Sequence, residues 1–403
     1  MNRAFDYLAL SEIYRLPPKG GHVLWLHRVC QRLSGVRLLA GRSDELPASV
    51  HVDGIDIRAV PLPRWSMLRP ESVPLYANLF WQGLRHLRGR RPRAILSARI
   101  LPEGLVASAL GHVGGVPTVV FAHGEEILVY GTDFAPPDRR KWTAACKRRF
   151  LWQAYRSADL IVANSHFTAN LLRGGGIRSD KVAIVHPGTD PERFRPAAKD
   201  RNLVERLGLH GKKVILTVGT VKERKGQDTV VQALPAVAAK VPEAVYVVGG
   251  SGSYRTTVAE MAEKYGVASR VRWLGAVPDT MLPRLYNLAD VFIMPNRTLP
   301  HSGDVEGFGI VFLEASACEV PVIGGRSGGV PDAVVDKETG LLVDGDSPEA
   351  VAEALVRVLT DTGLARRLGR TGRRRVCREL TWDHSAARIR GLIANLAAPR
   401  PRR

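Results

Sequence analysis

Two glutamates eight residues apart, Glu306 and Glu314, frame the segment whose residue types most clearly indicate chemistry. Glycines at 307 and 309 place Glu306 on a loop, and the apolar run from Ile310 begins a helix whose N–H groups point back at that loop. One carboxylate could accept hydrogen bonds from a sugar and the other from a ribose diol, with a phosphate at the helix start between them. The alternative is a helix with an ordinary acidic beginning.

A second candidate is the loop 219–226, which holds Lys222, Arg224 and Lys225 between two glycines. Arginine offers forked contacts and lysine a point charge, so such a loop at a helix start suits a diphosphate. It matches neither the Walker A pattern nor GxGxxG, and a solvated loop is the alternative.

Three weaker signals also follow apolar runs. Gly20 and Gly21 end a Pro-Pro-Lys-Gly-Gly turn where backbone N–H groups could approach an anion; a mobile loop is the alternative. His123 could donate a hydrogen bond to a substrate hydroxyl or stabilise developing charge, although a lone histidine is more often structural. The Gly-rich turn 249–253 could accommodate a nucleoside.

Alternating strands and helices must position these turns. The alternation predicts an α/β fold with parallel sheets, and its restart after a polar stretch near 191–200 predicts two domains. Parallel sheets of this kind bind ligands at the carboxyl ends of their strands. The expected strands are 5–10, 36–40, 94–97, 118–122, 160–163 and 182–185, then 214–218, 244–248, 271–274, 291–294, 321–324 and 340–343. The expected helices include 22–33, 101–110, 166–172, 227–239, 256–264, 309–317 and 348–359.

Composition limits the function classes. The 403 residues include 45% hydrophobic ones, which excludes a wholly disordered chain, and carry a net charge of +19. Four scattered cysteines suggest neither a disulfide framework nor a zinc cluster, and no apolar run predicts a transmembrane helix.

Cations mix with aromatics at 139–156 and cluster at 85–93. In one interpretation the cations form a solvated face over an aromatic core. In the other they contact a membrane surface or an acidic substrate. No nucleic-acid motif accompanies these segments.

The stretch from Glu306 to Glu314 resembles the E-x7-E signature of the family 4 retaining glycosyltransferases, which have the GT-B fold. The resemblance extends over nearly the whole chain. Residues 297–298 and 305–314 look most like bacterial phosphatidylinositol mannosyltransferases and related mannosyltransferases. The other similar segments are 164–165, 186–190, 290–343, the Pro-Pro-Lys-Gly-Gly turn and the final helix at Trp382.

The resemblance implies two Rossmann-like domains facing across a cleft, with the last helix crossing back to the first domain. We expect an N-terminal acceptor domain over residues 1–195 and a nucleotide-sugar domain over 205–380. A crossover helix and basic tail would occupy 381–403.

The resemblance also implies roles for individual residues. Lys225 would hold the donor diphosphate with Gly219 nearby, and Glu314 would bind the ribose. Glu306 would hold the transferred sugar, and His123 would bond that sugar near the reacting carbon. Gly21 would approach the diphosphate and Gly20 would lie on the acceptor side. Many members carry an arginine where this chain has Thr220, and Arg224 is a plausible substitute. The backbone of Gly307, Phe308, Gly309 and Ile310 would contact sugar and phosphates.

The implied activity is a retaining transfer of a hexose to a hydroxyl of a lipid-linked or glycan acceptor in cell-envelope or exopolysaccharide synthesis. GDP-mannose is the first choice of donor, while UDP-glucose, UDP-N-acetylglucosamine and UDP-galactose stay open. No Asp-x-Asp motif accompanies the donor loop, so we expect no metal and no cofactor besides the nucleotide-sugar.

We expect a cytoplasmic protein, either free or peripheral at the inner face of the cell membrane, where the basic first domain would meet an anionic surface. Nucleic acid is not an expected partner. The alternatives are a nucleotide-sugar epimerase and a non-enzymatic basic protein.

Overall fold

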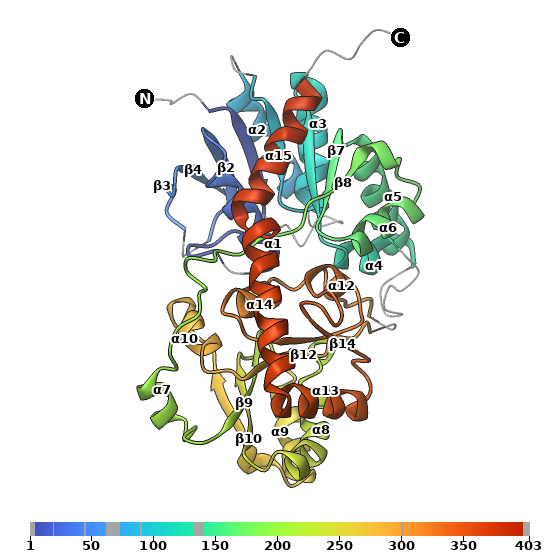
Figure 1. Ribbon diagram of the computed structural model, residues 1–403. Helices are drawn as coiled ribbons and strands as arrows, with labels where there is room; N and C mark the ends of the chain where they lie inside the picture. The colour runs from blue at the N-terminus through green and yellow to red at the C-terminus, as the bar shows by residue number, and fades with distance from the viewer. Residues whose placement is uncertain are drawn as a thin grey trace. The chain divides into compact units, whose positions relative to one another are not determined.

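The computed structural model describes residues 5–18, 20–43, 46–61, 73–88, 91–131, 141–299 and 302–397. Within the predicted motifs and basic clusters, Lys19, Arg90, Arg139 and Arg140 lie outside the described residues, as does the basic tail from 398. The chain divides into two compact units (Figure 1). Unit 1 comprises residues 1–186 and 382–403, and unit 2 comprises residues 187–381.

The described part of unit 1 is built on an eight-stranded sheet in the order β3-β4-β2-β1-β5-β6-β7-β8. Every residue of β1, β6 and β7 is buried, as expected for strands covered on both faces. Its strands are β1 (Tyr7–Ser11), β2 (Val36–Gly41), β3 (Ser49–Val52), β4 (Ile55–Val60), β5 (Ala94–Ser97), β6 (Thr118–Ala122), β7 (Leu160–Ala163) and β8 (Val182–Ile184). Its helices are α1 (Gly21–Cys30), α2 (Val73–Leu87), α3 (Leu105–Gly114), α4 (Glu125–Gly131), α5 (Lys141–Ser157), α6 (His166–Gly174) and α15 (Trp382–Ala397).

The sequence prediction missed β3 and β4, which form the one antiparallel pair of the sheet as described. β3 reads Ser-Val-His-Val and its residues alternate between exposed and half-buried, so it lacks the apolar run that marks a buried strand. Asp53 and Gly54, both at positive φ, form the two-residue turn of this hairpin.

Unit 2 contains a six-stranded parallel sheet in the order β11-β10-β9-β12-β13-β14. All twelve predicted strands of the two halves are confirmed within two residues at each end. The strands of unit 2 are β9 (Lys213–Val218), β10 (Ala244–Gly249), β11 (Val271–Gly275), β12 (Val291–Met294), β13 (Val322–Gly325) and β14 (Gly340–Val343). Its helices are α7 (Arg201–Arg206), α8 (Gln227–Lys240), α9 (Arg255–Lys264), α10 (Leu282–Tyr286), α11 (Ile310–Ala317), α12 (Val330–Ala333), α13 (Pro348–Thr360) and α14 (Thr362–Glu379).

The boundary between the units comes earlier than expected. Residues 187–195 belong to unit 2, because Phe194 is buried in the core of that unit with its ring 5.7 Å from that of Tyr286. The Thr189 amide also donates to the carbonyl of Leu380 at 2.9 Å. Because this stretch is otherwise polar, its sequence does not indicate that the ring of Phe194 anchors it in the core of unit 2.

The last helix, α15, returns to unit 1 as predicted, and is drawn in red in Figure 1. It packs on α1, where Arg32 pairs with Asp383 at 2.7 Å. The Ser385 hydroxyl donates to the carbonyl of His186 at 2.5 Å, and Ile389 is fully buried. None of the helices in the described ranges has the length and apolar character needed to cross a bilayer.

In unit 2, α14 packs directly on α11. An added Cβ at Gly369 would lie 2.0 Å from the carbonyl oxygen of Glu319, the residue that leaves α11 at a φ of 60°. The Arg373 guanidinium donates to the carbonyl of Ala317, which satisfies one of the free carbonyls at the end of α11. Close backbone approach therefore fixes the position of α11.

Replacing Gly369 with alanine is expected to destabilise unit 2 by about 1–3 kcal/mol, because the methyl group overpacks this contact. An exposed helical glycine should respond in the opposite way, since alanine is the better helix former by about 1 kcal/mol. Gly391 in α15 meets nothing within 4 Å of an added Cβ and is the matched control. Denaturant unfolding of both variants measures the difference; equal stabilisation by both would contradict the packing argument.

Candidate functional site

Two glycine turns that the sequence marked separately form one backbone surface at the carboxyl ends of β9 and β10. The Gly219 amide donates to the carbonyl of Gly249 at 2.9 Å, and the Val221 amide donates to that of Ser251 at 3.0 Å. An added Cβ at Gly250 would lie 1.8 Å from the carbonyl oxygen of Gly219. Only glycine permits this approach at position 250, so the backbones of the two turns lie directly against each other there.

The cations of the 219–226 loop converge on Glu306. Arg224 Nη1 lies 2.8 Å from Glu306 Oε2, and Lys225 Nζ bonds to the same oxygen. Lys225 is only 9% exposed, so the prediction of a merely solvated loop is wrong for this residue. Gly226, at a φ of 71°, turns the chain into α8 against the carbonyl of Pro295.

The charge on Glu306 is maintained by these neighbours. Burial by itself would raise the pKa of this carboxyl group. The positive charges of Lys225 and Arg224, with hydrogen bonds from both, outweigh burial and lower the pKa to about 2. Glu306 is therefore ionised at neutral pH, and a phosphate that bound these cations would compete with it.

Three further residues complete the cluster and were not among the predicted site residues. Asp304 Oδ1 lies 2.6 Å from Arg224 Nε, and Asn296 Nδ2 donates to Glu306 Oε2 at 3.2 Å. The amide of Arg297 donates to the carbonyl of Arg224 at 3.0 Å. Asn296 lies two residues after the end of β12, so its place near a strand end was the signal that could have identified it.

The helix that follows Glu306 has the predicted form. Gly309, at a φ of 96°, is the N-cap of α11, and Ile310 begins the helix. Phe308 is buried in the core of unit 2, so only its backbone remains for a ligand. Glu314 lies one turn into α11 and is also buried, with the Tyr286 hydroxyl donating to it at 2.7 Å. Gly307 is half-buried on the loop between them.

In unit 1, His123 lies beside the glycine turn. Its ring centroid is 5.8 Å from that of His22, which follows Gly21, while Gly20 caps α1 at a φ of 91°. His123 Nε2 lies 2.7 Å from the carbonyl of Ala98. A carbonyl only accepts hydrogen bonds, so this contact fixes the tautomer that carries a proton on Nε2.

The tautomer corrects one expectation. Burial lowers the pKa of His123 to about 4, so the ring is neutral at pH 7 and its Nδ1 can only accept a hydrogen bond. From the sequence, this side chain could have donated to a substrate hydroxyl, but its N–H is already engaged by the carbonyl of Ala98. The ring could instead receive a hydroxyl hydrogen.

A buried carboxyl group supports the same edge of unit 1. Glu103, with no exposed surface, accepts a 2.6 Å hydrogen bond from the amide of Glu12, the residue that follows β1. Arg99 bonds to Glu12 at 3.0 Å and lies 3.7 Å from Glu103. Burial raises the pKa of Glu103 to about 7, despite the opposing charge of Arg99. The lone carboxylate inside the apolar stretch 101–122 was the available sequence signal.

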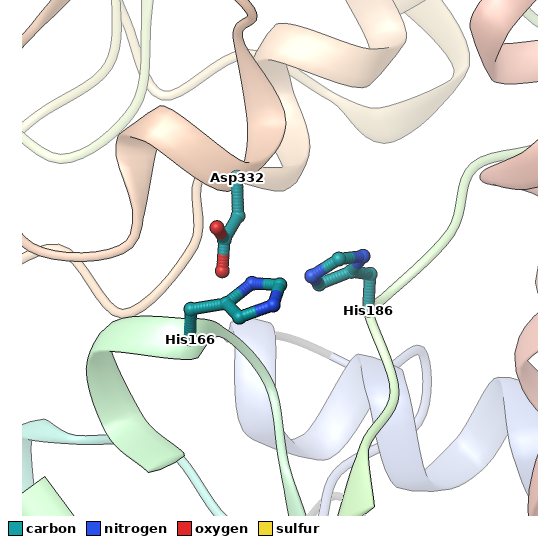
Figure 2. A group of neighbouring side chains, drawn as sticks. All are labelled: His166, His186 and Asp332. Carbon is teal, nitrogen blue, oxygen red and sulfur yellow. The ribbon is translucent and has the colours of Figure 1, made fainter. Parts of the chain in front are cut away.

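Two segments that carried the family resemblance also meet in unit 1. His166, which begins α6 after Ser165, has its ring centroid 5.8 Å from that of His186 (Figure 2). Asp332, drawn in the same figure, belongs to unit 2. Residues 164–166 and 186 therefore share one corner of unit 1.

Family models match both halves of the chain. The model described as Glycosyltransferase Family 4 matches residues 22–193, and the one described as Glycosyl transferases group 1 matches residues 200–375. The sequence is 36% identical over 289 residues to the GDP-mannose-dependent alpha-(1-6)-phosphatidylinositol monomannoside mannosyltransferase of Mycobacterium tuberculosis, covering 72% of each chain. The chain belongs to the family 4 glycosyltransferases. The resemblance inferred from its motifs is confirmed.

This glycosyltransferase is also similar to a second relative and to a solved structure. It is 31% identical to the D-inositol 3-phosphate glycosyltransferase of Salinispora arenicola over 397 residues, covering 91% of this chain and 85% of the other. Its fold resembles that of HepE from Anabaena, solved in complex with UDP, with a TM-score of 0.78 at 17% identity. That match covers 97% of this chain and all of HepE, and it confirms the predicted GT-B fold class.

Replacing Glu103 with glutamine should change the pH dependence of stability. The folded pKa near 7 lies above the ordinary value of 4.5, so the wild-type carboxyl loses its stabilising contribution as pH rises through this window. Between about pH 5 and about pH 8 the variant should gain up to about 3 kcal/mol relative to wild type.

Denaturant unfolding at the two pH values measures this double difference. His22 and His123 titrate in the opposite sense, since burial lowers the pKa of both, but they are present in both proteins and cancel. A pH-independent difference would contradict the buried-carboxyl argument.

Proposed function

We propose that this glycosyltransferase moves mannose from GDP-mannose to a hydroxyl of an inositol-containing, lipid-linked acceptor, with retention at the anomeric carbon and without a metal ion. The observation that carries the proposal is the meeting of Arg224 and Lys225 at Glu306 Oε2, next to the start of α11. A diphosphate needs cations and free N–H groups, and this edge of unit 2 supplies both.

Donor binding would redistribute the charges of this cluster. The diphosphate would take over Arg224 and Lys225, and Glu306 would then accept hydrogen bonds from hydroxyls of the transferred sugar. Glu314 would bind the ribose. The cations would stabilise the negative charge that grows on the departing diphosphate, which is electrostatic catalysis.

The bond changes follow a front-face route. The bond between the anomeric carbon and the phosphate oxygen breaks while the acceptor oxygen bonds to the same face of that carbon. The acceptor proton passes to the departing phosphate. His123 Nδ1 would accept a hydrogen bond from a hydroxyl of the sugar, consistent with the neutral ring.

Both donor and acceptor choices are supported by the names of the relatives. The Mycobacterium tuberculosis protein is named for GDP-mannose and for a phosphatidylinositol monomannoside, and the Salinispora arenicola protein for an inositol phosphate. A phosphorylated inositol is common to both acceptors. We therefore place the acceptor of this enzyme in the same chemical class.

Two helices of unit 1 present surfaces suited to a lipid-borne acceptor. On α2, Trp81 is 55% exposed and shares its helical face with Arg85 and Arg88. On α5, Phe150 is 52% exposed among cations, whereas Tyr155 is buried. The aromatics of α5 are thus only partly core, and the exposed ones would enter the interface of an anionic membrane.

A transfer assay with purified enzyme tests the proposal. GDP-mannose, UDP-glucose, UDP-galactose and UDP-N-acetylglucosamine are each offered with phosphatidylinositol or with inositol 3-phosphate. We expect product from GDP-mannose, in the α configuration by proton NMR, and undiminished by a chelator. Product from a UDP-sugar alone would discard mannose, and a β product would discard retention.

Replacing Lys225 with alanine is expected to lower kcat/KM about 100-fold or more, because a cation held in advance at the leaving group is lost. Lys222 lies in the same loop but is exposed, so its alanine variant should stay within about twofold of wild type. Circular dichroism verifies that both variants fold. Near-normal turnover by Lys225→Ala would contradict the assignment of the donor site.

A further inference from the structure

A groove on α14 carries positive charge that the proposed transfer reaction does not use. It has a volume of about 600 Å³. Arg366, Arg370 and Arg374 line it together with Arg367 and Thr371 of the same helix. Glu319 supplies the one carboxylate of this lining.

The three arginines form a row. Positions four apart face the same side of a helix and are separated by about 6 Å along its axis, so the row is about 12 Å long. All three side chains are exposed along the groove. Guanidinium groups form forked hydrogen bonds with phosphate oxygens, so a row of them can bind more than one phosphate group.

The groove arginines differ from the other arginines of α14. Arg373 donates to the carbonyl of Ala317, and Arg375 donates to those of Asp332 and Ala333 at 2.7 and 2.9 Å, so both serve packing. Among the arginines of the groove lining, Arg367 donates to the carbonyl of Lys337 at 3.0 Å and Arg374 donates to the hydroxyl of Thr371 at 3.2 Å. Within the part of the chain that the structure describes, the side chains of Arg366 and Arg370 have neither hydrogen bonds nor ion pairs. Their forked donors are free for a ligand.

The groove is distinct from the donor site. Glu319 follows the carboxyl end of α11, whereas Glu306 and Gly309 precede its amino end. The eight residues of α11 span about 12 Å, so a ligand in the groove and a nucleotide at the start of α11 could bind together.

We propose that this groove binds a ligand bearing two or more phosphate groups. Such a ligand would be either a free polyphosphorylated small molecule or the head groups of anionic lipids. This binding goes beyond sugar transfer and is independent of the nucleotide-sugar.

Two probes separate the sources. Inorganic tripolyphosphate is titrated into the full-length protein by calorimetry with GDP and UDP present, and sedimentation measures binding to phosphatidylglycerol–phosphatidylcholine vesicles. The groove variant is Arg366→Gln/Arg370→Gln/Arg374→Gln. The matched control removes three exposed cations of unit 2 outside the groove lining, as Arg201→Gln/Arg206→Gln/Lys240→Gln.

We expect the groove variant to lose about tenfold or more in affinity for at least one probe, while the control stays within about twofold of wild type. Loss of tripolyphosphate binding identifies a free phosphate ligand, and loss of vesicle binding alone identifies lipid head groups. Equal losses in both variants would show only a general charge effect and overturn the proposal, as would no loss in either assay. Thermal unfolding verifies that both variants are folded.

Discussion

A carboxylate removed from water needs opposite charge around it, and the strand-end edge of unit 2 around Glu306 depends on how that need is met. Arg224 and Lys225 reach it from the end of β9, and Asn296 reaches it from the end of β12, the neighbouring strand. The pairing draws together loops more than 70 residues apart in sequence. The same cations would neutralise a diphosphate, so the interaction that stabilises the edge also prepares it for a ligand.

At the strand ends of unit 1, two buried titratable side chains are shifted toward their neutral forms. Burial keeps His123 uncharged and raises the pKa of Glu103, whose nearest cation is 3.7 Å away. A neutral imidazole nitrogen accepts hydroxyl hydrogens, whereas paired cations attract phosphate. The strand-end edges of the two units therefore differ in the chemistry of their side chains.

The helix α14 divides its arginines between two tasks. Arg373 and Arg375 cap backbone carbonyls, and Arg373 in particular holds the end of α11, while Arg366 and Arg370 along the groove remain available. Gly369 permits the close approach that puts the groove beside Glu319. Packing contacts and available surface charge are thus carried by different residues of one helix.

Local sequence patterns predicted the buried strands and several residues of the candidate site. Apolar runs located the buried strands, and the types and spacing of Lys225, Glu306 and Glu314 indicated the loops of the candidate site, because parallel strands bring their carboxyl ends to one edge. The same patterns could not place the polar segments. β3 has no apolar run, and residues 187–195 belong to unit 2 through Phe194. Only tertiary structure decided that Asp304 and Asn296 complete the charge cluster and that Ala98 sets the tautomer of His123. Burial and hydrogen-bond partners arise from residues distant in sequence, and no local pattern encodes them.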